Sequence, residues 1–451
     1  MFENRKRVVL LAAICALAFV SLSAQTADTE PKGNSPYSRF GLGDLVNPLF
    51  AAQTAMGGLS AAYNDPFHLN MANPAALGHL MATDLETGFF AKYSSISDGN
   101  SSASLWSGNL NYFALGMPIM NPINRALEKK SDKIGLGMGF VLQPYSNVGY
   151  NLVTTQQYPE IGEAATNFKG SGGTYRLMWG NGFRYGRFSA GVNIGYLFGK
   201  ISYDRTVQFN DVANQSYLTR YLDEQSVSGF LWNAGAQLSV PLVKKPEGVT
   251  RSTKEKNLIF GVYGNSSTGL STNNSSFHTR YNLTYNDRDT ILLETDSIRK
   301  GTLPGEVVFG VTYDHSNKLK LGVEYAITAW SAYVNPLQSA GLNNARRISV
   351  GIEYVPDMFS YNNYFQRIRY RGGFSHRTDP RSVDGKQLTE YGVSLGLGFP
   401  VILPRQQTSF INLTLEGGRF GAGSPLRETY ARMTLGFSLN DNSWFFKRKF
   451  N

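Results

Sequence analysis

The clearest candidate for catalytic chemistry is a glycine–x–serine–x–glycine pattern at residues 392–396, centred on Ser394. In many hydrolases this pattern places a nucleophilic serine on a sharp turn between a strand and a helix. Here the pattern lies inside an alternating run at 390–400, which predicts the middle of a strand. Ser394 then shares a face with glycines and is not exposed by a turn. We interpret the match as coincidental and expect no enzyme, keeping a hydrolase only as a third hypothesis.

Other residue types that carry catalysis or bind metals are sparse. The five histidines are His68, His79, His278, His315 and His376. Their separations do not match metal-binding motifs. The only cysteine, Cys15, cannot form an intramolecular disulfide or a cysteine metal cluster. Because the chain also lacks a phosphate loop and a dinucleotide fingerprint, we expect neither a metal nor a cofactor.

The composition indicates an ordered protein rich in strands. Hydrophobic residues make up 42% of the 451 residues, which excludes a disordered chain. Charged residues make up only 17%, whereas 47 glycines and 13% aromatic residues are present; soluble domains average about 25% charged residues. The net charge of +10 could suggest nucleic-acid binding. The export signal and the strand pattern described below argue against that class of partner.

Residues 1–24 have the features of a secretory signal peptide. Three basic residues at 5–7 precede an apolar run at 8–20, and small residues follow up to a predicted cleavage after Ala24. Residues 25–34 then form an N-terminal extension. Beyond residue 24 no apolar stretch approaches the roughly 20 residues of a membrane helix. The mature chain is therefore expected either to be a large secreted all-β protein or to form a β-barrel in an outer membrane.

Strict alternation of apolar and small or polar residues runs through much of the chain. At 319–327 the odd positions are leucine, valine, tyrosine and isoleucine, and the even positions are Lys320, Gly322, Glu324 and Ala326. A period of two predicts strands. In a soluble sandwich the apolar face would pack on another sheet. In an outer-membrane barrel it would face lipid, and the other face would line the lumen.

The number and spacing of these segments favour the barrel. Fourteen segments have the length of barrel strands: 83–96, 105–117, 133–145, 172–184, 186–200, 226–240, 255–265, 303–314, 317–328, 346–355, 367–376, 390–400, 408–418 and 430–440. The connections alternate between mostly short ones and long polar ones, and the long ones are 146–171, 201–225, 266–302 and 329–345. Barrels sort short periplasmic turns from long outer loops in this way. We predict a 14-stranded antiparallel transmembrane β-barrel at 83–440, with both termini in the periplasm.

Polar residues on the small face are expected to line the lumen. The predicted lining residues are Glu324, Glu353, Glu416, Arg369, Arg371 and Arg432. Mixed charges suggest internal salt bridges that rigidify the lumen, although a substrate path stays open as an alternative. The tail at 441–451 carries Lys447, Arg448 and Lys449. These cations either are simply solvated or dock an acidic periplasmic partner.

Residues 35–82 do not alternate and are too apolar for a free tail. Their Gly, Pro and Asn content, including Gly57, Gly58 and the sequence Asn73-Pro74-Ala75, predicts turns and short helical pieces. Pro74 restricts the backbone and Asn73 can hydrogen-bond a turn. Because a 14-stranded barrel is too wide to be filled by its own side chains, we predict that 35–82 folds inside the lumen as a hatch.

Two stretches of the chain resemble the FadL family of outer-membrane transporters. The first is the run 54–58 followed by Asn73-Pro74-Ala75, which looks like the hatch of that family. The second, 303–331, is similar to its mid-barrel hairpin. The resemblance implies a 14-stranded barrel with an N-terminal hatch. It also implies passive transport of long-chain fatty acids or other hydrophobic compounds, in contact with membrane lipid.

Three features depart from that family. Residues 35–44 form an extra N-terminal segment, the predicted outer loop at 266–302 is polar, and a basic tail follows the last strand. FadL-like barrels also serve as plug or shuttle subunits of type IX secretion machines. The sequence therefore leaves two hypotheses: passive transport gated by the hatch, or a barrel subunit that closes or escorts an outer-membrane translocon.

Overall fold

The computed structural model describes most of the chain after residue 34. The described ranges are 35–99, 101–120, 133–158, 162–210, 217–243, 256–282, 287–316, 318–335, 341–403, 407–422 and 424–441. The predicted signal peptide, the 25–34 extension and the three cations at 447–449 lie outside the described residues.

Fourteen antiparallel strands form a closed wall, as the sequence predicts. They are β2 (Thr83–Ser97), β3 (Ser102–Pro118), β4 (Ile134–Tyr158), β5 (Gly162–Tyr185), β6 (Phe188–Asn210), β7 (Tyr217–Pro241), β8 (Lys256–Asn265), β11 (Glu306–His315), β12 (Leu319–Thr328), β13 (Ala345–Tyr354), β14 (Arg369–Val383), β15 (Lys386–Leu403), β16 (Gln407–Phe420) and β17 (Arg427–Asp441). Pairing of β17 with β2, from Arg427↔Ser97 to Asp441↔Thr83, closes the barrel. We call the end that holds Thr83 and Asp441 the turn end, and the opposite end the extended end.

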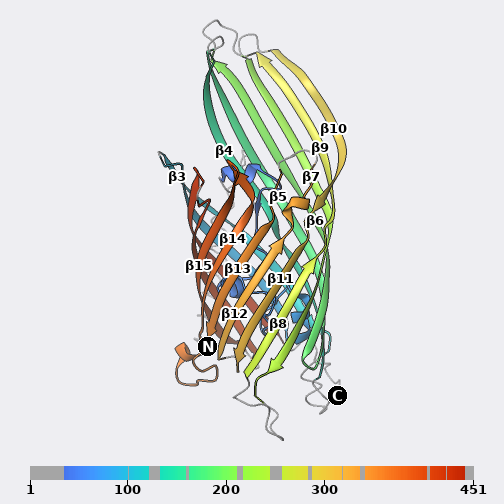
Figure 1. The fold of residues 1–451 in the computed structure, drawn as a ribbon, viewed down its shortest axis with the longest axis vertical. Coiled ribbons are helices and arrows are strands. Elements are labelled where there is room, and N and C mark those ends of the chain that lie inside the picture. Colours follow the sequence, from blue (N-terminus) through green and yellow to red (C-terminus); the bar gives the residue numbers. More distant parts are fainter. Residues whose placement is uncertain are drawn as a thin grey trace, which may run out of the picture.

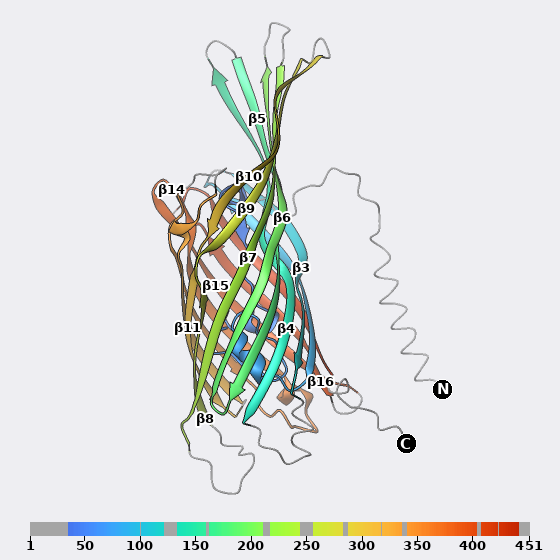
Figure 2. The same ribbon diagram turned by 90° about the vertical axis from the view of Figure 1, so that its right-hand side faces the viewer.

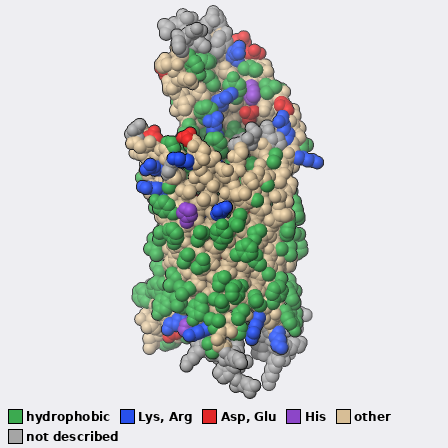
Figure 3. All heavy atoms as spheres, viewed as in Figure 1, with side chains coloured by type: hydrophobic (Ala, Val, Ile, Leu, Met, Phe, Trp, Pro, Cys, Tyr) green, Lys and Arg blue, Asp and Glu red, His purple; other side chains and the backbone are tan. Residues whose placement is uncertain are grey.

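The alternation along each strand separates a lipid-type outer surface from a polar interior. On β12, Leu321 and Val323 are 43% and 54% exposed, whereas Lys320 and Glu324 are 3% and 2% exposed. On the face seen in Figure 3, hydrophobic side chains gather in a broad band across the part of the barrel nearer the turn end. This is the surface that a membrane-spanning β-barrel presents to lipid.

In three of the four long loops predicted from the sequence, nearly all of the described residues belong to strands. Strands β4 to β7 continue past the wall, and β9 (Thr268–Asn282) and β10 (Asp287–Leu303) extend the lines of β8 and β11. Together the six form one antiparallel sheet beyond the barrel, which we call the extended sheet (Figures 1 and 2). The prediction of loops at 146–171, 201–225 and 266–302 is therefore wrong. A strand outside the membrane can be polar on both faces, since neighbouring strands satisfy its backbone, so hydropathy does not reveal it.

The N-terminal segment, residues 35–82, contains short elements enclosed by the strands. They are η1 (Pro36–Arg39), β1 (Asp44–Leu45), α2 (Ala51–Thr54) and η2 (Pro74–His79). Figures 1 and 2 show this segment in blue, running from the extended end of the barrel into its interior. Two further 3-10 helices, η3 (Trp330–Ala332) and η4 (Tyr364–Arg367), lie in connections between strands. In the part of the chain that is described, no helix has the length and apolar character needed to cross a membrane.

Residues 49–82 make up much of the buried core. Phe50 stacks on Tyr112 of β3 with ring centroids 4.1 Å apart. The same cluster contains Leu69, Leu77 and Val141. Apolar burial of this kind stabilises the contact between segment and wall by about 25 cal/mol per Å². The interior of the barrel is therefore packed at this level.

Candidate functional site

Glycines on the inner face of the wall allow the backbone of residues 56–78 to touch the strands directly. At seven of them an added Cβ would overlap backbone atoms of the segment: Gly135, Gly137, Gly182, Gly191, Gly261, Gly351 and Gly373. We call these seven residues the glycine belt. A glycine is required where two backbones approach this closely. The small residues that alternate along the predicted strands therefore create room for the segment.

Asn73 and Pro74 form the start of η2, against β7 and β8. The Asn73 side chain accepts a hydrogen bond from the Ala75 amide at 3.1 Å and donates to the Ala61 carbonyl at 2.6 Å. Asn73 is fully buried, and its amide group lies where a Cβ on Gly235 would be. Pro74 occupies the first turn of η2, where its missing N–H is not needed. The asparagine thus connects two turns of the N-terminal segment to each other and to the wall.

Gly57, which precedes Gly58, meets Ser394 of the wall at another contact of the segment. Both glycines have left-handed backbone angles, with φ of 68° and 88°. The Ser394 hydroxyl accepts a hydrogen bond from the Gly57 amide at 3.0 Å and donates to the Ala55 carbonyl at 3.2 Å. Ser394 is 4% exposed and lies within β15, without a following helix. It therefore anchors the segment and does not have the geometry of a nucleophile.

The carboxylate of Glu324 binds the turn at residues 60–61 of the N-terminal segment. Its carboxylate accepts hydrogen bonds from the amides of Ser60 and Ala61 at 2.6 and 2.7 Å, and from the Ser60 hydroxyl. Arg347 of β13 lies 2.7 Å away and balances the charge. A charged acceptor with several donors is a strong anchor. The predicted lining residue Glu324 is thus used entirely in holding the segment.

A buried ion network lies closer to the turn end and is centred on Asp65. Its carboxylate is 2.5 Å from Arg369 and 3.2 Å from Lys320. Glu353 lies 2.7 Å from Arg371 and within 4 Å of both other cations. All five side chains are at most 5% exposed. The network joins β12, β13 and β14 to the N-terminal segment.

The sequence identified only part of this network. Glu353, Arg369 and Arg371 are among the predicted lining residues, but Asp65 and Lys320 are not. Alternation places Lys320 on the inner face of its strand, so the sequence pattern is sufficient to predict Lys320 as a lining residue. Asp65 precedes Pro66, a pattern that predicts only a turn. Its partners Lys320 and Arg369 lie 255 and 304 residues further along the chain, beyond any spacing rule.

Nearer the extended end, the interior holds a charged chamber with a volume of about 400 Å³. The remaining predicted pair, Glu416 and Arg432, lines it and is 3.7 Å apart. Further cations and acids share the lining: Lys92, Arg176, Arg377, Arg381, Glu306, Glu390 and Glu428. Salt bridges connect several of them, including Lys92–Glu428 at 2.6 Å and Arg377–Glu390 at 2.5 Å. The chamber thus combines charged side chains with apolar ones such as Leu105 and Phe420.

Beside the chamber, the wall opens at a seam between β3 and β4. The last pairing between these strands is Phe113↔Leu142, and β4 then shifts register at Pro144. Among the described residues, none from Ser102 to Tyr112 pairs with β4, although this stretch pairs with β2. Side chains from both sides of the seam, including Asn109 and Tyr145, line the chamber. The seam therefore lies beside the chamber, where β3 and β4 do not pair.

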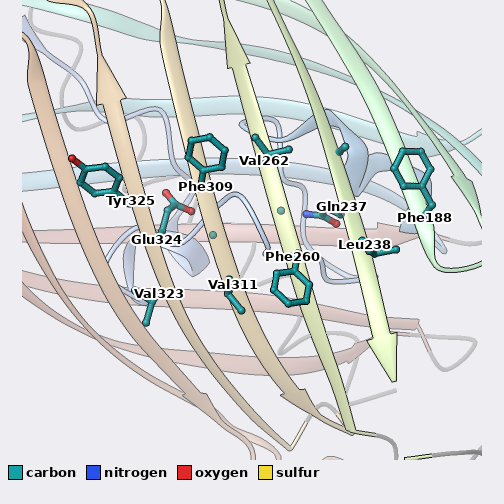
Figure 4. Close-up of a pocket in the computed structure, with 13 residues that line it drawn as sticks. Phe188, Gln237, Leu238, Phe260, Val262, Phe309, Val311, Val323, Glu324 and Tyr325 are labelled. Carbon is teal, nitrogen blue, oxygen red and sulfur yellow. The ribbon is translucent and has the colours of Figure 1, made fainter. Parts of the chain in front are cut away.

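A second hollow of about 540 Å³ lies on the outer surface of the wall. Its lining includes Phe188, Leu238, Phe260, Phe309 and Tyr325. Figure 4 shows these side chains standing out from neighbouring strands, away from the interior. The hollow belongs to the apolar band, where acyl chains of lipid would contact it. In the described ranges, no group of three or more His, Cys, Asp or Glu side chains is placed to hold a metal ion.

The closed wall, apolar band and polar interior define the class as an outer-membrane β-barrel. A family model described as BamG matches residues 5–451. The chain therefore belongs to the BamG family. No curated protein matched the sequence.

Solved structures share the fold at low sequence identity. A Pseudomonas aeruginosa FadL homologue has a TM-score of 0.50 and 14% identity, covering 89% of this chain and 99% of its own. A variant of the TodX monoaromatic hydrocarbon channel gives the same score and identity, covering 88% and 99%. At this identity the likeness shows the fold alone. It confirms the FadL-type fold predicted from the sequence.

Proposed function

We propose that this chain is a non-enzymatic barrel that gives hydrophobic compounds a passive route into the outer membrane. The observation that carries the proposal is the seam between β3 and β4, which opens beside the chamber. A compound would enter the chamber from the extended end and leave sideways through the seam into lipid. Proteins of this fold include one titled a monoaromatic hydrocarbon channel. The signal peptide predicted from the sequence and the apolar band on the wall support a location in the outer membrane.

In this proposal, residues 35–82 act as the hatch and close the lumen below the chamber. The glycine belt, Asn73, Ser394, Glu324 and the Asp65 network support this role. Moving the hatch would break all of these contacts together. Lateral exit needs none of them to break. We therefore propose that residues 47–82 of the hatch stay in place during transport, with the turn end and the C-terminus in the periplasm.

The test compares two Ser→Trp variants on β3. Ser107→Trp places a large ring in the chamber lining, whereas Ser104→Trp places the same ring at an exposed position on the strand. Entry of a hydrophobic fluorescent dye into proteoliposomes is measured for both. We expect Ser107→Trp to slow entry at least tenfold and Ser104→Trp to leave it unchanged. Equal rates for Ser107→Trp, Ser104→Trp and empty liposomes would reject the route.

A second candidate function is a subunit of an outer-membrane protein-secretion machine, such as that of type IX secretion. The extended sheet favours it, because strands of up to 25 residues reach well beyond a membrane-spanning length. Such a sheet offers a large surface to another protein. A mild-detergent purification from outer membranes, with mass spectrometry, tests this candidate. A stoichiometric partner that is lost from a variant lacking the extended sheet would support it, and a lone barrel would reject it.

The basic tail gives the second candidate a further test. Replacing Lys447, Arg448 and Lys449 by alanine should release an acidic periplasmic partner if the tail docks one. The transport hypothesis expects unchanged dye entry in that variant.

A further inference from the structure

The first twelve described residues, 35–46, form a strap along the edge of β4 that β3 leaves free. Asp44 and Leu45 pair with Asn147 and Ser146 as a short antiparallel strand. The Val46 amide donates to the Tyr145 carbonyl at 3.0 Å. The strap therefore takes the place of β3 as the partner of β4, immediately above the register shift at Pro144.

Further along β4, two serines continue these contacts. The Ser35 amide donates to the Gly149 carbonyl at 2.9 Å. The Ser38 hydroxyl accepts from the Gly149 amide at 3.1 Å and also contacts its carbonyl. Backbone groups of β4 that would be left unpaired at the seam are in this way satisfied, which matters at the edge of a membrane.

The other side of the strap is held by the opposite wall. The Tyr37 hydroxyl donates to the Leu426 carbonyl at 2.6 Å and lies 2.9 Å from the Ser424 hydroxyl. Its ring meets Phe420 edge-on at 5.3 Å. Burial raises the pKa of Tyr37 above its usual value, so the hydroxyl remains a donor. The strap thus crosses the extended end of the barrel from β4 to the β16–β17 connection.

An arginine on β14 completes this anchor. One guanidinium nitrogen of Arg381 donates to the Tyr37 carbonyl at 2.7 Å and to the Asp44 carboxylate at 2.6 Å. Asp379 holds the same guanidinium at 2.6 Å. Asp44 is 38% exposed at its side chain, whereas Arg381 is 7% exposed. Water therefore reaches Asp44, which belongs to the strap, whereas Arg381, which belongs to the wall, is held in place by Asp379.

The strap and the hatch core are attached in different ways. Residues 56–78 contact the wall through the glycine belt and buried ion pairs. The strap is held at its two sides by hydrogen bonds, by one partly exposed ion pair, and by the buried apolar side chain of Leu42, which packs in a cluster with Val148. It also lies over the chamber, because Ser35, Asp44, Leu45 and Val46 are part of the chamber lining.

We propose that residues 35–46 are a releasable latch that covers the chamber and the seam, while residues 47–82 stay fixed. Release of the latch exposes the chamber and the β3–β4 seam at the extended end. The role of the latch in passage rests on the proposed transport function. Its movement can be measured without any transport.

The experiment places a single thiol behind the latch. Asn109→Cys lies in the chamber lining, and the one natural cysteine, Cys15, belongs to the predicted signal peptide. Labelling of this thiol by a membrane-impermeant maleimide is followed in outer membranes. The release variant is Tyr37→Phe with Ser38→Ala, which removes hydroxyl contacts at both sides of the strap. Tyr364→Phe is the matched control, because it removes a similar tyrosine bond, to Pro400, at the turn end.

We expect the release variant to be labelled at least tenfold faster than the control. Equal labelling rates in the release variant and Tyr364→Phe would overturn the latch. A second variant, Leu45→Cys with Ser146→Cys and without the Asn109→Cys thiol, joins paired positions of the strap and β4 by a disulfide. Oxidation should stop dye entry and a reductant should restore it. A third outcome separates the two proposals. If the release variant is labelled faster than the control but the unmodified protein admits no dye, the latch is supported and the transport function is rejected.

Discussion

Arg369 of β14 donates a hydrogen bond to Asp65 of the N-terminal segment at 2.5 Å, joining residues 304 positions apart in the chain. Lys320 of β12 approaches the same carboxylate oxygen at 3.2 Å. The three side chains are almost fully buried. The pair therefore ties the segment inside the barrel to two wall strands.

The first prediction concerns this ion network. Asp65→Asn leaves Arg369 and Lys320 buried with less negative charge, which costs about 3 kcal/mol when a buried pair is broken. We expect a clearly lower unfolding temperature in detergent. The control is Asp204→Asn, which breaks a more exposed pair with Arg220, an effect of about 0–1 kcal/mol. Similar losses in both variants would show that the Asp65 network does not hold the segment.

The second prediction concerns the glycine belt. Gly261→Ala would place a methyl group against the Ala61 carbonyl, and overpacking of this kind costs about 1–3 kcal/mol. Gly269→Ala on β9 meets no atom within 4 Å and is the matched control. Thermal unfolding of the two variants measures the difference. If Gly261→Ala is as stable as Gly269→Ala, the wall and the segment do not touch as described.

The third prediction concerns Asn73. Asn73→Ala removes the acceptor for the Ala75 amide and the donor to the Ala61 carbonyl, leaving buried groups unsatisfied at about 1–3 kcal/mol. If the N-terminal segment acts as the proposed hatch, loosening it should make cells more sensitive to large polar antibiotics. Asn363→Ala is the control, because Asn363 makes the same kind of cap at the surface helix η4. Unchanged sensitivity in Asn73→Ala would argue against a lumen that the hatch keeps closed.

The fourth prediction concerns Ser394. A serine-directed fluorophosphonate probe should leave this residue unmodified, because its hydroxyl is buried and bound to Gly57 and Ala55. Mass spectrometry of the treated protein in detergent measures the modification. Stoichiometric labelling of Ser394 would revive the hydrolase hypothesis. Ser394→Ala is expected to lower stability by about 1 kcal/mol through its lost hydrogen bonds.

Several features follow from the sequence because they depend on local periodicity. Alternation at segments such as 319–327 reports which side chains face lipid, so it predicted the fourteen strands and the inner position of Glu324 and Glu353. The length of those runs also matched the membrane, since only the lipid-facing part needs a continuous apolar face. The absence of alternation at 35–82 marked the segment that lies inside the wall.

Other features were decided only by the tertiary structure, because they depend on residues that are distant in the chain. The extended sheet is built from largely polar segments, which look like loops until its strands are seen to pair. Asp65 meets Arg369 only after the barrel closes around the segment, and Ser394 is occupied by Gly57 for the same reason. The strap pairs with the edge of β4 because β3 does not pair with β4 at that level. Short-range patterns determine which face of a strand meets lipid, whereas closure of the barrel determines which interior groups meet.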